Sequence, residues 1–169
     1  MRKIVLSAVL LLSLCVFALP QDRIIALPDS PRRIQIGAEK SILAFQDGQS
    51  QLEIVLPEGA NRILQFAAAE LQEYFRRSCQ VEVPVVNAPD DSKVSIILGD
   101  NQWSRQAGLD CTTLPRDGYY LKSVGRRIYI AGVDDPKGNP AEAFSWSVFF
   151  ERGTLNGVYE FLERFLGIR

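Results

Sequence analysis

The apolar positions of residues 152–169 recur every three or four residues, which is the spacing of an amphipathic helix. The stripe consists of Leu155, Val158, Tyr159, Leu162, Phe165 and Leu166. Gly167 follows directly and is a common C-terminal stop, because glycine readily adopts the left-handed backbone that ends helices. The pattern therefore predicts a helix that ends at Gly167 and packs one face on a sheet.

A second stripe with the same period covers residues 61–77. Its apolar positions are Leu64, Ala67, Ala68, Leu71, Tyr74 and Phe75. Asn61 is a favourable N-cap, and the three consecutive alanines raise helix propensity. We expect a long helix from Asn61 to about Arg77 that approaches a sheet closely.

Short apolar runs bounded by turn residues predict strands at 41–45, 52–56, 81–86, 94–98, 119–124 and 127–131. Asp47-Gly48 predicts a hairpin between the first two runs, and Gly125 a hairpin between the last two. Pro84 restricts 81–86 to a sheet edge or a strand end. Residues 94–98 are nearly all apolar, which is typical of a central buried strand. Residues 101–107 are expected to form one or two helical turns.

This order of elements predicts an α+β fold. Two long helices on one face of a mixed five- or six-stranded sheet form a two-layer sandwich. Strands that are separated by a whole helix are candidates for a parallel, right-handed connection. A loop of about twenty residues, 132–152, leads into the last helix.

The N-terminus has the pattern of a secretory signal peptide. Arg2 and Lys3 precede an apolar run over residues 4–16, and residues 16–18 provide a cleavage site. The run is shorter than the roughly 20 residues that span a bilayer, although an uncleaved anchor is the alternative. We expect a signal peptide at 1–18, a linker at 19–39 and one domain at 40–169, in a secreted or periplasmic protein.

After removal of residues 1–18 the chain carries 17 basic and 20 acidic residues. The arginine pairs 32–33, 76–77 and 126–127 are isolated and are interpreted as solvated edges. No basic stretch follows a phosphate backbone, so the composition disfavours nucleic-acid binding. No membrane contact is expected after cleavage of the leader.

Cysteine and histidine usage restricts the possible chemistry. Cys79 and Cys111 remain in the mature chain, either as a disulfide or as two separate thiols, and the sequence has no histidine. Ser-His and Cys-His couples are therefore absent, and neither a metal site nor a cofactor is expected. A thiol-dependent enzyme that uses one of the cysteines is a remaining alternative.

Carboxylate pairs are the other candidates, because glycoside hydrolysis uses two of them. Glu70 and Glu73 on one predicted helix, and Glu160 and Glu163 on the other, fall off the apolar stripes and are interpreted as solvated. Glu160 and Arg164 are spaced for an i,i+4 pair. The Asp134-Asp135 dipeptide is interpreted either as a cation ligand or as a turn. The sequence predicts no catalytic residue.

The long loop is unusual, because loops of this length are uncommon and often functional. It holds four aromatic residues within seven positions: Phe144, Trp146, Phe149 and Phe150. They can seal the core of their own domain, pack on a neighbouring domain, or stack on a sugar. The candidate contact residues for a sugar or a second domain are Phe144, Trp146, Phe149 and Arg152.

Four segments carry a resemblance to a known family: AAAELQEY at 67–74, SIILG at 95–99, IAG at 130–132 and GTLNGVYEFLERFLGIR at 153–169. In this order they resemble the N-terminal accessory domain of secreted bacterial glycoside hydrolases, shared by α-glucuronidases, β-hexosaminidases and large uncharacterised bacterial proteins. The last group is the most similar, because of the long aromatic loop.

The resemblance covers residues 40–169 and implies a non-catalytic domain that supports a (β/α)8 catalytic barrel in cis. The family's catalytic carboxylates lie in that barrel, and none of them maps onto this sequence. The chain is then an N-terminal fragment, and its partners are the barrel and a polysaccharide. The alternative is a free-standing exported carbohydrate-binding or interaction module.

Overall fold

A computed structural model of the chain describes residues 23–26, 33–36, 45–46, 49–142 and 149–168. The chain divides into two units, residues 1–41 and 42–169. The first unit contains two antiparallel strands, β1 (Arg23–Ala26) and β2 (Arg33–Ile36). The sequence predicted only a linker in this region, and the predicted signal peptide lies outside the described residues.

The second unit is built on a five-stranded mixed sheet. Across the sheet the strands are β6 (Val85–Val86), β5 (Leu52–Val55), β7 (Val94–Leu98), β9 (Arg127–Gly132) and β8 (Tyr119–Val124). The first four are parallel, and β8 runs antiparallel to β9. The predicted central strand 94–98 is confirmed, since all five residues of β7 are buried.

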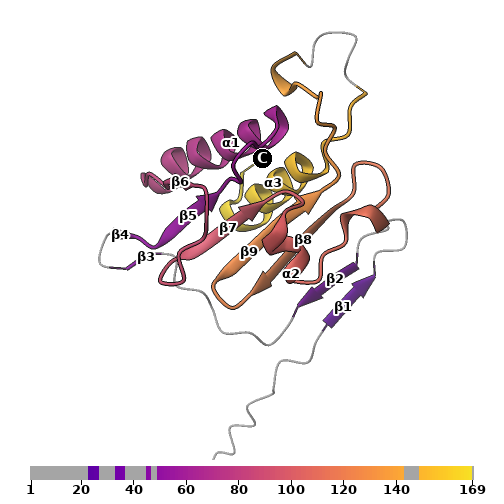
Figure 1. Cartoon of the computed structure of the whole chain (residues 1–169). Coiled ribbons are helices and arrows are strands. Elements are labelled where there is room, and N and C mark those ends of the chain that lie inside the picture. Colours follow the sequence, from indigo (N-terminus) through magenta and orange to yellow (C-terminus); the bar gives the residue numbers. More distant parts are fainter. Residues whose placement is uncertain (1–22, 27–32, 37–44, 47–48, 143–148, 169) are drawn as a thin grey trace, which may run out of the picture. The chain divides into compact units, whose positions relative to one another are not determined.

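Two long helices pack on one face of this sheet. They are α1 (Arg62–Cys79) and α3 (Gly153–Leu166), and they lie side by side in Figure 1. The side chain of Asn61 accepts a hydrogen bond from the N–H of Leu64 at 2.9 Å, and Gly167 ends α3 in the left-handed conformation. The predicted α+β sandwich with two long helices on one face is therefore confirmed.

The other face of the sheet is covered by shorter elements, α2 (Gln102–Gln106) and the 3-10 turn η1 (Cys111–Thr113). Alternate residues of the strands, among them Val55, Ile97 and Tyr129, form a second and smaller apolar cluster with Leu109 and Cys111. The sequence predicted the turns at 101–107 but not this second cluster.

The hairpin predicted between residues 41–45 and 52–56 is wrong. The chain reverses through two-residue strands, β3 (Phe45–Gln46) and β4 (Gln49–Ser50), which pair with each other. β5 instead pairs in parallel with β6 and β7. All four residues of β5 are buried, as is typical of a strand that is covered on both faces. Residues 41–44 lie outside the described part of the chain.

Glu53 is an acidic residue buried inside the sheet, with 2% of its surface exposed. Its Oε1 accepts hydrogen bonds from the Ser95 hydroxyl and from the N–H of Asp90, both at 2.7 Å. Glu53 therefore joins β5 to β7 and holds the loop that precedes β7.

Replacing Glu53 with alanine is expected to lower the free energy of unfolding by about 2 kcal/mol, because two buried donors lose their acceptor. Glu53→Gln keeps the acceptor oxygen and is expected to cost only about 1 kcal/mol. Urea denaturation of both variants measures the difference. Equal losses would mean that the hydrogen bonds of Oε1 contribute little.

Candidate functional site

No local side chain caps the start of α3. Arg152 occupies the N-cap position, and its side chain makes no hydrogen bond to the first turn. Three backbone N–H groups at this end donate to distant residues: Arg152 N to Asp117 Oδ1 at 3.1 Å, Gly153 N to Val133 O at 2.9 Å, and Thr154 N to Asp134 Oδ1 at 3.0 Å. These donors are the groups with which helix N-termini bind anions. Since they are already satisfied, the start of α3 is a structural junction.

Three glycines allow the chain to approach itself at this junction. Gly118 precedes β8, Gly132 ends β9 and Gly153 begins α3. A Cβ atom on Gly132 would lie 2.7 Å from the carbonyl oxygen of Gly118, and one on Gly153 would lie closer than 3.0 Å to the same oxygen. The junction therefore excludes side chains at positions 132 and 153.

Asp134 links the end of β9 to α3. It pairs with Arg152 as an isolated antiparallel bridge, so that the two ends of the long loop are held together. Burial raises the pKa of Asp134 from 3.8 to about 6; the hydrogen bonds from Thr154 oppose this rise, and the charges of Asp117 and Glu151 add to it. From the sequence, Asp134 was interpreted either as a cation ligand or as part of a turn. In the structure its carboxylate caps the start of α3.

The two described aromatic residues of the loop, Phe149 and Phe150, differ in their exposure to solvent. Phe150 is 8% exposed and belongs to the main core, whereas 79% of Phe149 is exposed. Arg116 donates to the carbonyl oxygen of Phe149, and the guanidinium of Arg152 lies 5.5 Å from the centre of the Phe150 ring. Phe144 and Trp146 lie outside the described residues. Of the four predicted contact residues, Phe149 thus presents an aromatic surface, and Arg152 covers an inner ring.

The candidate carboxylates of the helices lie on the helix surfaces. Glu73 pairs with Arg76 and with Arg77, and the hydrogen bond from Arg76 is the main reason that its pKa is lowered. The predicted pair between Glu160 and Arg164 is present.

Glu70 accepts a hydrogen bond from the Tyr159 hydroxyl at 3.1 Å, which joins α1 to α3. Burial raises the pKa of Tyr159 to about 12, and the nearby Glu70 charge adds to the rise. Glu70, Glu73 and Glu160 are thus engaged in contacts between and along the helices, and Glu163 is exposed.

The two cysteines are free thiols, which answers the question that the sequence left open. Cys79 is exposed at the end of α1, whereas Cys111 is buried in the second apolar cluster. Burial raises the pKa of Cys111 to about 11, so this thiol stays protonated at neutral pH. Such a thiol is a poor nucleophile, which argues against a thiol-dependent enzyme that uses Cys111.

Within the residues that the structure describes, no group of three or more acidic, cysteine or histidine side chains is placed to hold a metal ion. No helix in the same part of the chain has the length and apolar character needed to cross a membrane.

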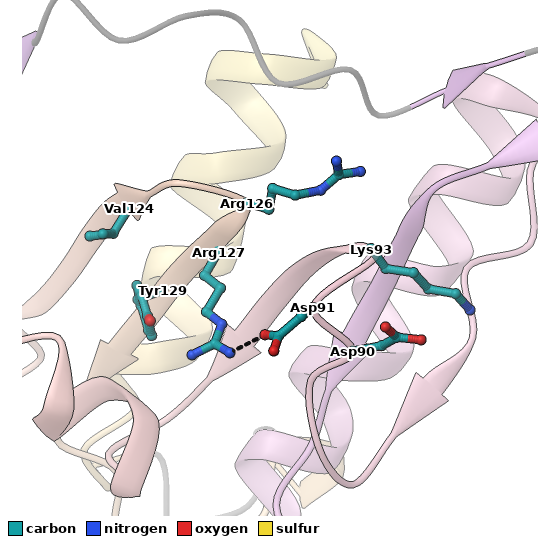
Figure 2. A pocket seen from close by; sticks show the side chains of 7 residues that line it. All are labelled: Asp90, Asp91, Lys93, Val124, Arg126, Arg127 and Tyr129. Carbon is teal, nitrogen blue, oxygen red and sulfur yellow. Dashed lines mark hydrogen bonds and ion pairs between the residues drawn. The ribbon is translucent and has the colours of Figure 1, made fainter.

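A groove of about 340 Å³ lies where β7 and β9 begin, at the opposite end of β9 from Gly132. One wall is the loop before β7, with Asp90, Asp91 and Lys93, and the other is the β8–β9 turn, with Val124, Arg126 and Arg127. Figure 2 shows the guanidinium of Arg127 turned to Asp91 and that of Arg126 pointing away from this pair.

Only some of the charges in this groove are paired. Arg127 Nη2 and Asp91 Oδ1 lie 2.6 Å apart, and this hydrogen bond, with one to Tyr129, raises the pKa of Arg127. The Oδ1 atom of Asp90 accepts bonds from the N–H and the hydroxyl of Ser92, both at 2.8 Å, and these bonds lower the pKa of Asp90.

The sequence did not predict the groove. Arg126 and Arg127 were interpreted as a solvated edge, and residues 90–93 belong to a connection without a motif. The two walls are more than thirty positions apart in the sequence, and only the pairing of β7 with β9 brings them together. No local signal was available to find them.

The comparisons with known proteins give a fold but no family. No protein-family model and no curated protein matches the chain. Part of a family GH115 4-O-methyl-α-glucuronidase with specificity for decorated arabinogalactans is similar, with a TM-score of 0.50 and 17% identity over 72% of this chain. A GH138 enzyme that targets pectin rhamnogalacturonan II has 17% identity over 67% of this chain, with a TM-score of 0.43.

The chain spans only 14% of the length of the GH115 enzyme and 13% of the GH138 enzyme. At 17% identity the likeness to the GH115 enzyme concerns the fold alone. The fold of part of this chain is thus similar to part of a glycoside hydrolase, which supports the sequence resemblance at the level of the fold.

Proposed function

We propose that this chain provides a non-catalytic accessory domain of an exported carbohydrate-active enzyme. The observation that carries the proposal is the fold match to a segment of a much longer glucuronidase. Glu70, Glu73 and Glu160 add support, because they are engaged by ion pairs and by the hydrogen bond from Tyr159. Export rests on the N-terminal sequence pattern.

In this proposal the exposed end of the long loop contacts a catalytic barrel in cis. Phe149 has the largest exposed fraction among the described large apolar residues. Its backbone is fixed by Arg116, and its neighbour Phe150 is anchored in the core. An aromatic side chain on a fixed backbone is a typical interface anchor.

The variant Phe149→Ala tests this contact. In the isolated chain it is expected to change the free energy of unfolding by less than about 0.5 kcal/mol, because the side chain is exposed. In the product of the complete gene it is expected to lower the melting temperature of the barrel and the rate of glycan hydrolysis. Differential scanning calorimetry and a reducing-sugar assay measure both effects.

Phe165→Ala is the matched control, since Phe165 is 66% exposed near the other end of α3. A reading frame that ends at codon 169, or glycan hydrolysis by the chain alone, would contradict the accessory role.

The exposure of Phe149 also favours a second candidate, a free-standing carbohydrate-binding or interaction module. Titration of the purified chain with polysaccharides separates the two. A change in tryptophan fluorescence on addition of a glycan, reduced in Phe149→Ala, would support the binding module.

A further inference from the structure

The groove between the β6–β7 connection and the β8–β9 turn is lined by two cations, Lys93 and Arg126, that form no close ion pair within the described part of the chain. They stand on opposite walls, and Figure 2 shows both side chains extending away from the Arg127–Asp91 pair. The lining also includes Arg127, Asp90 and Asp91, and the charge of Lys93 interacts with that of Asp90. The cations still outnumber the carboxylates, and a concave surface with an excess of positive charge attracts an anionic group.

The groove also contains hydrogen-bond acceptors. The Oδ1 atom of Asp90 is used by Ser92, and Asp91 is paired with Arg127 through Oδ1. The second oxygen of each carboxylate has no hydrogen-bond partner among the described residues, and both side chains line the groove. These oxygens favour a ligand with hydroxyl donors and oppose one with a second negative charge.

We propose that this groove binds a hydroxylated organic acid of about the size of one sugar ring. The carboxylate lies between Arg126 and Lys93, where the guanidinium donates two parallel hydrogen bonds. Ring hydroxyls donate to the free oxygens of Asp90 and Asp91. The volume of about 340 Å³ is at the lower end of the range for small-molecule sites.

The site does not depend on the proposed accessory role. It lies at the beginning of β9, whereas Phe149 and the start of α3 lie at the other end of that strand, beyond Gly132. Failure of one proposal therefore leaves the other in place.

Isothermal titration of the full chain with D-galacturonate, D-galactose and sulfate tests the site. The first two probes differ only in the carboxylate, and sulfate supplies charge without ring hydroxyls. We expect saturable binding of galacturonate in the millimolar range, and at least about tenfold weaker binding of galactose and of sulfate. Equal affinity for sulfate and galacturonate, or no saturable binding of galacturonate, would overturn the proposal.

Variants assign the binding to the groove. The double variant Lys93→Gln, Arg126→Gln is expected to weaken galacturonate binding at least about tenfold, whereas Arg62→Gln on the exposed surface of α1 leaves it unchanged. Asp91→Asn removes a negative charge and is expected to strengthen sulfate binding. Unaltered circular dichroism shows that each variant is folded, and unaltered galacturonate binding in the folded double variant would refute the site.

Discussion

Replacing Gly153 with alanine is expected to destabilise the domain by about 3 kcal/mol or more. The added methyl group would overlap the carbonyl oxygen of Gly118, which belongs to the backbone and cannot rotate away. Relief of the overlap requires α3 to move from β9, and this breaks the bonds from Gly153 to Val133 and from Thr154 to Asp134. The loss is measured by urea denaturation monitored by circular dichroism.

Without this contact, Gly153→Ala would be expected to stabilise α3, because alanine is the better helix former by about 1 kcal/mol. Gly59→Ala is the control: Gly59 has a positive φ of 74° and no atom within 4 Å of an added Cβ. It is expected to cost about 1–2 kcal/mol through backbone strain alone. If Gly153→Ala costs no more than Gly59→Ala, the close approach of the backbones does not stabilise the junction.

Much of the sandwich could be predicted because its signals are local. The stripe and the cap at Asn61 fixed the start of α1, Gly167 marked the end of α3, and Gly125 marked the β8–β9 turn. Pro84 correctly placed its segment at the sheet edge, where only Val85 and Val86 pair.

The partner of β5 was predicted incorrectly because the Asp47-Gly48 signal was extended too far. The turn joins only β3 and β4, and the choice of parallel partners for β5 depends on burial of both faces of the strand. Glu53 is buried for the same reason, because it lies on β5 and both faces of this strand are covered. Its two hydrogen-bond donors come from residues that are 37 and 42 positions away, so no local pattern in the sequence predicts that Glu53 is buried.

The junction and the groove were missed for the same reason. Thr154 reaches Asp134 across 20 positions, and Arg127 reaches Asp91 across 36. Composition identified the aromatic loop as unusual but could not separate Phe149 from Phe150, because the packing of Phe150 against Gly138 and Ile63 decides which ring is buried. Charges and aromatic residues are visible in a sequence, whereas their pairing is set by the sheet order.

Asp134→Asn is expected to change how stability depends on pH. The pKa of Asp134 is about 6 in the folded protein and about 3.8 when exposed, so the folded state holds the proton more tightly. Stability from this group is therefore greatest below the exposed value and falls as pH rises from about 4 to about 6. The difference in pKa corresponds to a loss of up to about 3 kcal/mol at neutral pH.

An asparagine at this position still accepts the bond from Thr154 but carries no charge. The variant is therefore expected to match the wild type near pH 4 and to exceed its stability by up to about 3 kcal/mol above pH 6. Urea denaturation of both proteins at several pH values gives this difference, and other titrating carboxylates cancel in it. Glu58→Gln, which changes an exposed carboxylate, is the control. Its free energy of unfolding is expected to differ from that of the wild type by the same amount at every pH. If Asp134→Asn also keeps a constant difference, the carboxylate of Asp134 is not held in a buried, proton-retaining position at the start of α3.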